Sequence, residues 1–255
     1  MPSARQAAMS WLLQRAKLRY PALYRDIELV AGRPTLQDLS LCTPVFPDAL
    51  ECLRYVLEEK DLVAWQGLSE EFWILEKRLS RRRQEVPLAY PSNFPVQTQT
   101  ARLLYTLIRI VRPVRVLETG VADGYSAAIV LSALDRNGAG ELHSVDIKDD
   151  VGVLVECHQD RWRLHVVDDR DSMRQLRRIG DNVKPVDIFF HDSDHRFVPQ
   201  IREFELARAV LRPGGFLVSD DVDLSHAYPS FLERYCYRAA TVLDSVKVSA
   251  LMQVS

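Results

Sequence analysis

The chain has 255 residues, of which 47% are hydrophobic and 27% are charged, and its formal net charge is -2. This composition is typical of a soluble globular protein that can bury a substantial core. The small net charge disfavours a nucleic-acid partner, and no apolar run approaches the roughly 20 residues that span a membrane. We therefore expect neither nucleic acid nor a membrane among the partners.

The cysteines and the N-terminal segment indicate the compartment. Cys42, Cys52, Cys157 and Cys236 are scattered, without C-x-x-C spacing or a matching histidine pattern. We expect them to be reduced and mostly buried thiols, and we expect no zinc site. The first 20 residues mix basic side chains with apolar ones and contain no signal-peptide core. Together these features predict a cytoplasmic protein.

The first third of the chain is expected to be helical. Residues 1 to about 95 show no strand pattern, and Thr35 and Asp48 precede helix-forming segments as N-caps. The proline-rich segment 86–95 is typical of an extended connector. We therefore predict a helical extension over residues 1–91 that lies as a lid on a domain spanning residues 92–255. The aromatic candidates for lining this lid are Trp11, Trp65, Trp73, Tyr90 and Phe94.

From Val114 the sequence alternates between strand and helix patterns, which predicts an α/β protein with a doubly wound parallel sheet. After a first strand from Val114, we expect strands at Glu141–Ile147, Arg163–Val167, Val186–Phe190 and Phe216–Ser219, and a terminal antiparallel pair at Thr241–Asp244 and Ala250–Val254. The expected helices are Val96–Val111, Tyr125–Leu134, Asp171–Arg178, Val198–Leu211 and Pro229–Tyr237.

The segment V-L-E-T-G-V-A-D-G-Y-S is a short apolar run closed by an acid and followed by two glycines. Gly120 and Gly124 let the backbone turn tightly and approach a ligand, and the helix that follows has free N–H groups at its start. The segment resembles motif I of the class I S-adenosylmethionine-dependent methyltransferases, with Glu118 and Ser126 also at matching positions. A dinucleotide site would need G-x-G-x-x-G, and Ala122 stands where that pattern needs its second glycine.

This resemblance implies a Rossmann-like, seven-stranded methyltransferase sheet and S-adenosylmethionine as cofactor. It implies that Asp146, at the end of the second strand, binds the ribose hydroxyls of the cofactor. The alternative is that Asp146 is an ordinary surface acid. It implies that Asp169 contacts the adenine of the cofactor, although a helix N-cap role for Asp169 or Asp171 stays open. Glu118 would fix the glycine loop and the sulfonium end of the cofactor rather than transfer a proton. The implied cofactor-binding residues are Glu118, Thr119, Gly120, Gly124, Tyr125, Ser126, Asp146, Asp169 and Asp192.

Two further segments, F-F-H-D-S-D-H and F-L-V-S-D-D, resemble those of metal-dependent O-methyltransferases. The resemblance implies that Asp192, Asp220 and Asp221 bind one divalent cation. Three carboxylates that converge on one crevice repel each other unless protons or a cation neutralise them, and oxygen ligands with room for water suit Mg²⁺. The alternative is that these three acids bind no metal ion and instead cap helices or contact the ribose.

His195 follows Asp192 by three residues, where catechol-type relatives carry a lysine as general base. A histidine can accept a proton at neutral pH, and a D-x-D-H version occurs in relatives resembling antibiotic-sugar O-methyltransferases. His195 and Asp192 are therefore the expected catalytic residues. This departure from the catechol pattern argues against a catechol substrate, and a hydrogen-bonding loop role is the alternative for His195.

These patterns predict an S-adenosylmethionine-dependent methyltransferase that carries out Mg²⁺-assisted O-methylation of a small molecule, with a natural product among the candidates. A metal-independent N- or O-methyltransferase and a nicotinamide-dependent oxidoreductase are rival enzymes. A non-catalytic module that uses the fold for assembly is a rival of another class. A homodimer is one possible assembly.

Overall fold

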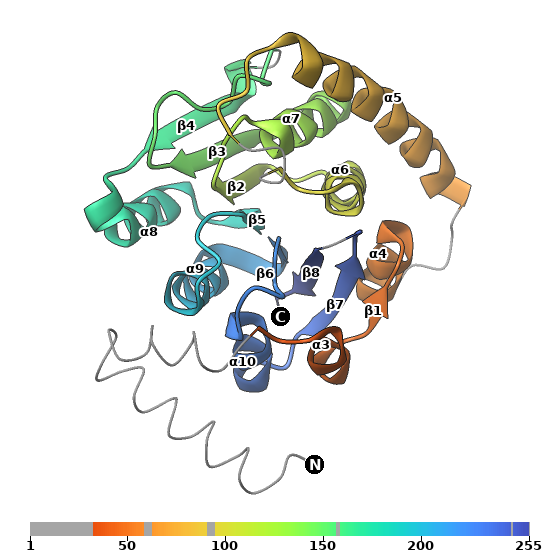
Figure 1. Cartoon of the computed structure of the whole chain (residues 1–255), viewed down its shortest axis with the longest axis vertical. Helices are drawn as coiled ribbons and strands as arrows, with labels where there is room; N and C mark the ends of the chain where they lie inside the picture. Colours follow the sequence, from red (N-terminus) through yellow and green to blue (C-terminus); the bar gives the residue numbers. More distant parts are fainter. Residues whose placement is uncertain (1–32, 59–62, 91–94, 157–158, 246, 255) are drawn as a thin grey trace, which may run out of the picture.

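The computed structural model describes residues 33–58, 63–90, 95–156, 159–245 and 247–254. Its centre is an eight-stranded sheet in the order β1-β7-β8-β6-β5-β2-β3-β4 (Figure 1). All neighbouring strands run parallel except β8, which is antiparallel to both β6 and β7. The strands are β1 (Val45–Phe46), β2 (Arg115–Thr119), β3 (Glu141–Asp146), β4 (Trp162–Val166), β5 (Val186–His191), β6 (Leu211–Ser219), β7 (Arg238–Leu243) and β8 (Val248–Gln253).

Helices cover both faces of the sheet, and each face has its own core. One core joins the sheet to α4 (Ala49–Leu57), α5 (Val63–Glu85), α6 (Thr98–Val111) and α7 (Tyr125–Asn137). The other joins it to α3 (Leu36–Cys42), α8 (Ser172–Val183), α9 (Phe197–Val210) and α10 (Ala227–Arg234). The two groups of helices lie on opposite sides of the sheet in Figure 1.

Alternation along the central strand β5 explains the two cores. Ile188 and Phe190 pack into the first core, while Phe189 between them packs into the second, and all three side chains are fully buried. Successive residues of a strand point to opposite faces, so a strand buried on both faces is apolar throughout.

The predicted order of strands and helices in the second part of the chain is confirmed. The terminal pair forms with Thr241 opposite Ala250, and Thr35 and Asp48 both cap helices as predicted. The prediction that no strand lies before residue 95 was wrong, because Val45–Phe46 pairs with the open edge of β7. A strand of two residues is too short to show an alternating pattern in the sequence.

The described part of the predicted lid shares the core of the sheet. Helices α4 and α5 both contact α6, and Trp65 is buried in this core while Trp73 is 42% exposed. Trp11, Phe94 and the domain boundary expected after residue 91 lie outside the described residues. The boundary therefore stays a prediction.

Two other predictions concern the cysteines and the membrane. Of the described cysteines only Cys52 is buried, whereas Cys42 and Cys236 are exposed, so the expectation of mostly buried thiols was wrong. Cys42 is the last residue of α3 and Cys236 lies in the turn after α10. Among the described residues, no helix combines the length and the apolar character that crossing a membrane requires.

The sheet brings the candidate residues together at one edge. Strands β2, β3, β5 and β6 are parallel and in register, so that Thr119 lies beside Val145 and His191, and His191 lies beside Ser219. The loops that follow these strands therefore meet at the carboxyl edge, where ligands bind in open α/β sheets.

Candidate active site

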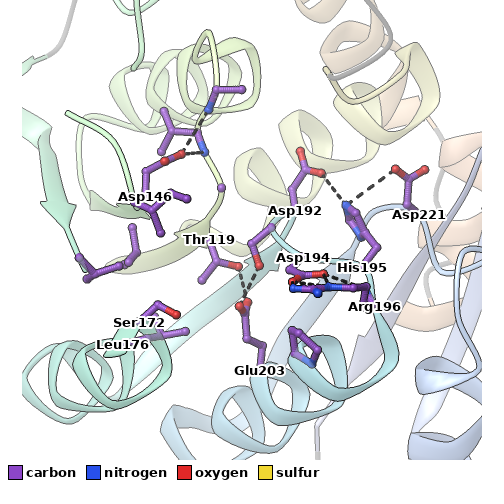
Figure 2. A pocket seen from close by; sticks show the side chains of 18 of the residues that line it. Thr119, Asp146, Ser172, Leu176, Asp192, Asp194, His195, Arg196, Glu203 and Asp221 are labelled. Carbon is purple, nitrogen blue, oxygen red and sulfur yellow. Dashed lines mark hydrogen bonds and ion pairs between the residues drawn. The ribbon is translucent and has the colours of Figure 1, made fainter. Parts of the chain in front are cut away.

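A cavity of about 1300 Å³ opens at this carboxyl edge. The loops after β2, β3, β4, β5 and β6 line it, and Figure 2 shows side chains from several of them converging on one space. In Figure 2, Asp146 lies on one side of this space, and the predicted catalytic residues Asp192 and His195 lie on the other. The cavity thus joins the two halves of the predicted site.

The glycine loop forms the floor of the cofactor half. Gly120 has a φ of +82°, and a Cβ at this position would collide with the main chain of Asp192. Asp146 holds the loop from the next strand, since its Oδ2 accepts a hydrogen bond of 2.8 Å from the backbone N–H of Val121. Its Oδ1 accepts a hydrogen bond of 3.0 Å from the backbone N–H of Lys148. Because Oδ2 also accepts a longer hydrogen bond of 3.5 Å from the N–H of Ala122, it is Oδ1 that has a further lone pair for a ligand hydroxyl.

Glu118 lies behind the loop and does not line the cavity. Its fully buried carboxylate accepts hydrogen bonds of 2.6 Å from the hydroxyls of Ser126 and Ser144. Burial raises the pKa of Glu118 to about 7, although both serine hydrogen bonds oppose the rise. The geometry agrees with the predicted role of fixing the loop but gives Glu118 no direct access to a ligand.

The other predicted cofactor residues divide between lining and supporting positions. Gly124 does not line the cavity, because it packs against the backbone of Gly152. Tyr125 lines it, but its hydroxyl donates to Glu76 at 3.2 Å. The remaining predicted cofactor residues that line the cavity are Thr119, Gly120, Ser126, Asp146, Asp169 and Asp192.

The loop after β4 shows which of its acids cap a helix. Asp168 caps the short 3₁₀ turn Asp169–Asp171 by accepting a hydrogen bond of 2.8 Å from the N–H of Arg170. Asp171 occupies the N-cap position of α8 without a side-chain cap bond. Asp169 makes no capping bond and lines the cavity, so its side chain is available to a ligand.

The sequence analysis missed Asp123 as a site residue. It is 3% exposed and lines the cavity, and its Oδ1 accepts a hydrogen bond of 3.0 Å from the N–H of Ala89. Its Oδ2 is buried with no hydrogen-bond partner among the described residues. Buried carboxylate oxygens are normally paired, so this unpaired atom is unusual.

The predicted catalytic residues meet at one point. His195 Nε2 lies 3.5 Å from Asp192 Oδ1 and 3.8 Å from Asp221 Oδ2, as Figure 2 shows. Burial alone would lower the pKa of His195, but hydrogen bonding to Asp192 and the charges of Asp192, Asp221 and Asp220 outweigh it and raise the pKa. Burial raises the pKa of Asp192 to about 8, against the opposing effect of His195.

The three predicted metal ligands do not surround an ion-sized space. The described residues contain no group of three His, Cys, Asp or Glu side chains that could hold a metal ion. Instead the ammonium of Lys247 lies 3.0 Å from Asp221 Oδ2 and 3.4 Å from Asp220 Oδ2. Asp220 is fully buried and does not line the cavity. As they lie, these side chains do not fit a divalent cation, because a positive group already stands among them.

Glu203 is a second residue that the sequence analysis missed. This carboxylate on α9 accepts hydrogen bonds from Thr119 Oγ1 at 2.6 Å, His191 Nδ1 at 2.8 Å and Ser193 Oγ at 2.8 Å. It lines the cavity and joins β2 to the loop after β5 (Figure 2). Its neighbour one turn earlier, Gln200, is also buried. Two polar residues on the buried face of one helix were the available signal.

Comparisons with known proteins agree with this geometry. Residues 117–222 match a family described as a methyltransferase domain. No curated protein matches the sequence. These 106 residues include the end of β2, all of β3, β4, β5 and β6, and the loops that follow these strands and line the cavity.

Solved structures of low sequence identity share the fold. An O-methyltransferase from Bacillus cereus in complex with SAH has a TM-score of 0.54 at 18% identity, covering 82% of this chain and 98% of its own. The O-methyltransferase TomG from Streptomyces achromogenes, involved in tomaymycin synthesis and solved with SAM, has a TM-score of 0.52 at 18% identity, covering 82% and 97%. The SAH-bound methyltransferase PaMTH1 from Podospora anserina has a TM-score of 0.56 at 13% identity, covering 71% and 87%.

The sheet order, the glycine loop at its carboxyl edge and the matched domain lead to one conclusion. Residues 117–222 match a methyltransferase domain, and the chain has the fold of methyltransferases solved with S-adenosylmethionine or S-adenosylhomocysteine.

Proposed function

We propose that this enzyme methylates an oxygen atom of a small molecule, with His195 as the proton acceptor. The observation that carries the proposal is His195 Nε2 at the cavity wall between the carboxylates of Asp192 and Asp221. Two solved structures of the same fold are O-methyltransferases, which favours oxygen as the acceptor atom by analogy of fold.

The cofactor half of the cavity has groups that suit each part of S-adenosylmethionine. The remaining lone pair of Asp146 Oδ1 suits a ribose hydroxyl, and the unpartnered Oδ2 of Asp123 suits the ammonium of the methionine part. Ile147 also lines the cavity and is 49% exposed, and it offers an apolar surface to the adenine ring. When bound, the cofactor supplies a methyl group on a sulfonium sulfur.

The residues at the other end handle the proton. His195 Nε2 accepts the proton of the acceptor hydroxyl, which leaves the oxygen nucleophilic toward the methyl carbon. Asp192 and Asp221 then stabilise the protonated imidazole. Proton removal by a positioned base accelerates such reactions by roughly 10²–10⁴-fold, and the fixed geometry of the two substrates contributes the rest.

The size of the cavity supports a small acceptor. Its volume of about 1300 Å³ exceeds the roughly 300–1,000 Å³ of a site for one small ligand. A cofactor therefore leaves room for a second small molecule beside it. Magnesium, which the sequence patterns favoured, is not part of this mechanism, because the ammonium of Lys247 stands among the carboxylates that would bind it.

A first experiment tests the cofactor. Thermal unfolding is followed with S-adenosylhomocysteine, with NAD and without ligand, because a ligand that binds only the folded state raises the melting temperature. We expect a rise with S-adenosylhomocysteine and none with NAD. A rise with NAD alone would contradict the proposal.

A second experiment tests the acceptor atom and the base. The enzyme and S-adenosylmethionine are incubated with matched panels of hydroxyl and amine compounds, and methylated products are identified by mass spectrometry. We expect products from hydroxyl compounds only, and a loss of about 10²-fold or more in turnover for His195→Gln. His143→Gln, on β3 and outside the cavity lining, is the control. Products from amines alone, or full turnover by His195→Gln, would refute the assignment.

A further inference from the structure

We propose that the ammonium of Lys247 takes the place of a divalent cation in this active site, so that methyl transfer proceeds without a bound metal ion. The role of Lys247 in catalysis rests on the proposed O-methyl transfer. Whether Lys247 excludes a cation is a separate question, which is measured without any methyl acceptor.

Lys247 forms a buried pair with two acids rather than a surface ion pair. Its Nζ lies 3.0 Å from Asp221 Oδ2 and 3.4 Å from Asp220 Oδ2. The Lys247 side chain is 14% exposed and that of Asp220 is fully buried. Exposed ion pairs contribute little because water screens them, whereas removing one partner of a buried pair leaves an uncompensated charge.

The backbone on the C-terminal side of Lys247 is fixed to the loop after β6. The next residue, Val248, accepts a hydrogen bond of 2.8 Å from the N–H of Val222 and donates its own N–H to Asp223 Oδ1 at 3.2 Å. Lys247 therefore emerges from an anchored strand end directly beside Asp221.

Asp220 is held toward Lys247 from its other side. Its Oδ1 accepts hydrogen bonds from Ser249 Oγ at 2.5 Å and from Thr100 Oγ1 at 3.4 Å. The Oδ2 atom is left to face the ammonium. Two hydroxyls from α6 and β8 thus fix the orientation of Asp220, so the contact with Lys247 does not depend on a free rotamer.

Lys247 and a metal ion exclude each other. Mg²⁺ binds carboxylate oxygens at about 2.0–2.1 Å, so an ion shared by Asp220 Oδ2 and Asp221 Oδ2 would need the space that Nζ holds. An ammonium has three N–H donors, and the two carboxylates take two of them. Because Lys247 lines the cavity, the third donor is available to the acceptor oxygen, where it would stabilise developing negative charge.

Titration with Mn²⁺, followed by its paramagnetic resonance signal, tests the inference on the full chain. Wild type is expected to show no saturable site. Lys247→Met is expected to bind Mn²⁺ at least roughly tenfold tighter than wild type, because an ammonium beside two carboxylates repels an entering cation strongly at this distance. Adding Asp221→Asn to Lys247→Met should abolish this increase in affinity for Mn²⁺. Lys184→Met removes an exposed lysine paired with Asp181 and is the matched control.

The outcomes separate this inference from the proposed function. The inference is overturned if wild type binds Mn²⁺ with micromolar affinity, or if Lys247→Met binds Mn²⁺ no more tightly than wild type. The wild-type titration tests the inference even if Lys247→Met does not fold. The melting-temperature rise with S-adenosylhomocysteine is measured in each protein. If S-adenosylhomocysteine does not raise the melting temperature of wild type, the cofactor assignment is refuted. The Mn²⁺ titration reports on Lys247 alone.

Discussion

Gly120 lies directly against the main chain of Asp192, so that a Cβ at Gly120 would stand 2.0 Å from the Asp192 carbonyl oxygen. The N–H of Asp192 also donates to Thr119 at 2.9 Å, and the N–H of Gly120 donates to Val145 at 2.9 Å. These contacts join the glycine loop to the loop that carries the proposed catalytic residues Asp192 and His195. The cofactor half and the acceptor half of the cavity therefore share one rigid junction.

The junction predicts a large effect of Gly120→Ala. The new Cβ meets backbone rather than a flexible side chain, and φ at this position is +82°. Together, the unfavourable conformation and the collision should cost roughly 3 kcal/mol or more of unfolding free energy, measured by urea denaturation. Gly138→Ala is the control, because Gly138 has a φ of +71° with nothing within 4 Å of a new Cβ. Equal losses in the two variants would contradict the close contact.

Asp123→Asn tests the unpartnered carboxylate oxygen. The amide keeps an oxygen for the N–H of Ala89 but replaces the charge that we assign to the ammonium of the cofactor. Hydrogen bonds to charged groups contribute about 1.5–3 kcal/mol, so S-adenosylhomocysteine should bind roughly tenfold or more weakly by calorimetry. Asp149→Asn, an exposed acid outside the cavity lining, is the control. Unchanged affinity in Asp123→Asn would leave Oδ2 without a ligand role.

The sequence predicted the parts of the site that depend on neighbours in the chain. The strand before Gly120 and the acid at the end of β3 are local patterns, and parallel pairing brings them to one edge. Asp192 and His195, which the resemblance to O-methyltransferases pointed to, are only three positions apart in the chain and lie together. The strand and the turn follow from periodicity and turn chemistry.

The residues that the sequence analysis missed depend on contacts between distant segments. Lys247 pairs with acids 26 and 27 positions away, and Glu203 accepts a hydrogen bond from Thr119, 84 positions away. No local pattern marks a single lysine before a strand as part of a buried cluster. The two carboxylates of the S-D-D segment also differ in the structure, because Asp221 lines the cavity and Asp220 does not.

Glu118 predicts a pH dependence of stability. Burial raises its pKa from 4.5 to about 7, so the folded state binds this proton more tightly than the unfolded state. The contribution of Glu118 to stability is therefore full below pH 4.5 and is lost as the pH rises to about 7, by up to about 3 kcal/mol. Glu118→Gln stays neutral and should lack this loss.

Urea denaturation of wild type and Glu118→Gln between pH 4.5 and 8 measures the effect. The difference in unfolding free energy should shift in favour of the variant as the pH rises. The Gln amide still offers one acceptor and one donor to the hydroxyls of Ser126 and Ser144. A difference that stays constant across this range would refute the raised pKa of Glu118.

Glu203→Ala should destabilise the protein more than any exposed carboxylate on the same helix. It would leave the hydroxyls of Thr119 and Ser193 and the ring of His191 without their acceptor, and each unpaired buried group costs about 1–3 kcal/mol. Burial would raise the pKa of Glu203, but His191 and the two hydroxyls outweigh it and lower the pKa. The stabilisation is thus present above the usual Glu pKa of 4.5 and is lost as the pH falls below it.

Urea denaturation at pH 7 and pH 4 tests this prediction, with Glu205→Ala as the matched control. Glu205 also forms ion pairs, with Arg208 and Arg234, but its side chain is 28% exposed, so its loss should cost about 1 kcal/mol or less. Glu203→Ala should lose several times more at pH 7, and the gap should narrow at pH 4. Because Thr119 lines the cavity, the same variant should also bind S-adenosylhomocysteine more weakly. Equal losses for the two variants at pH 7 would mean that the Glu203 network does not hold β2 and the catalytic loop together.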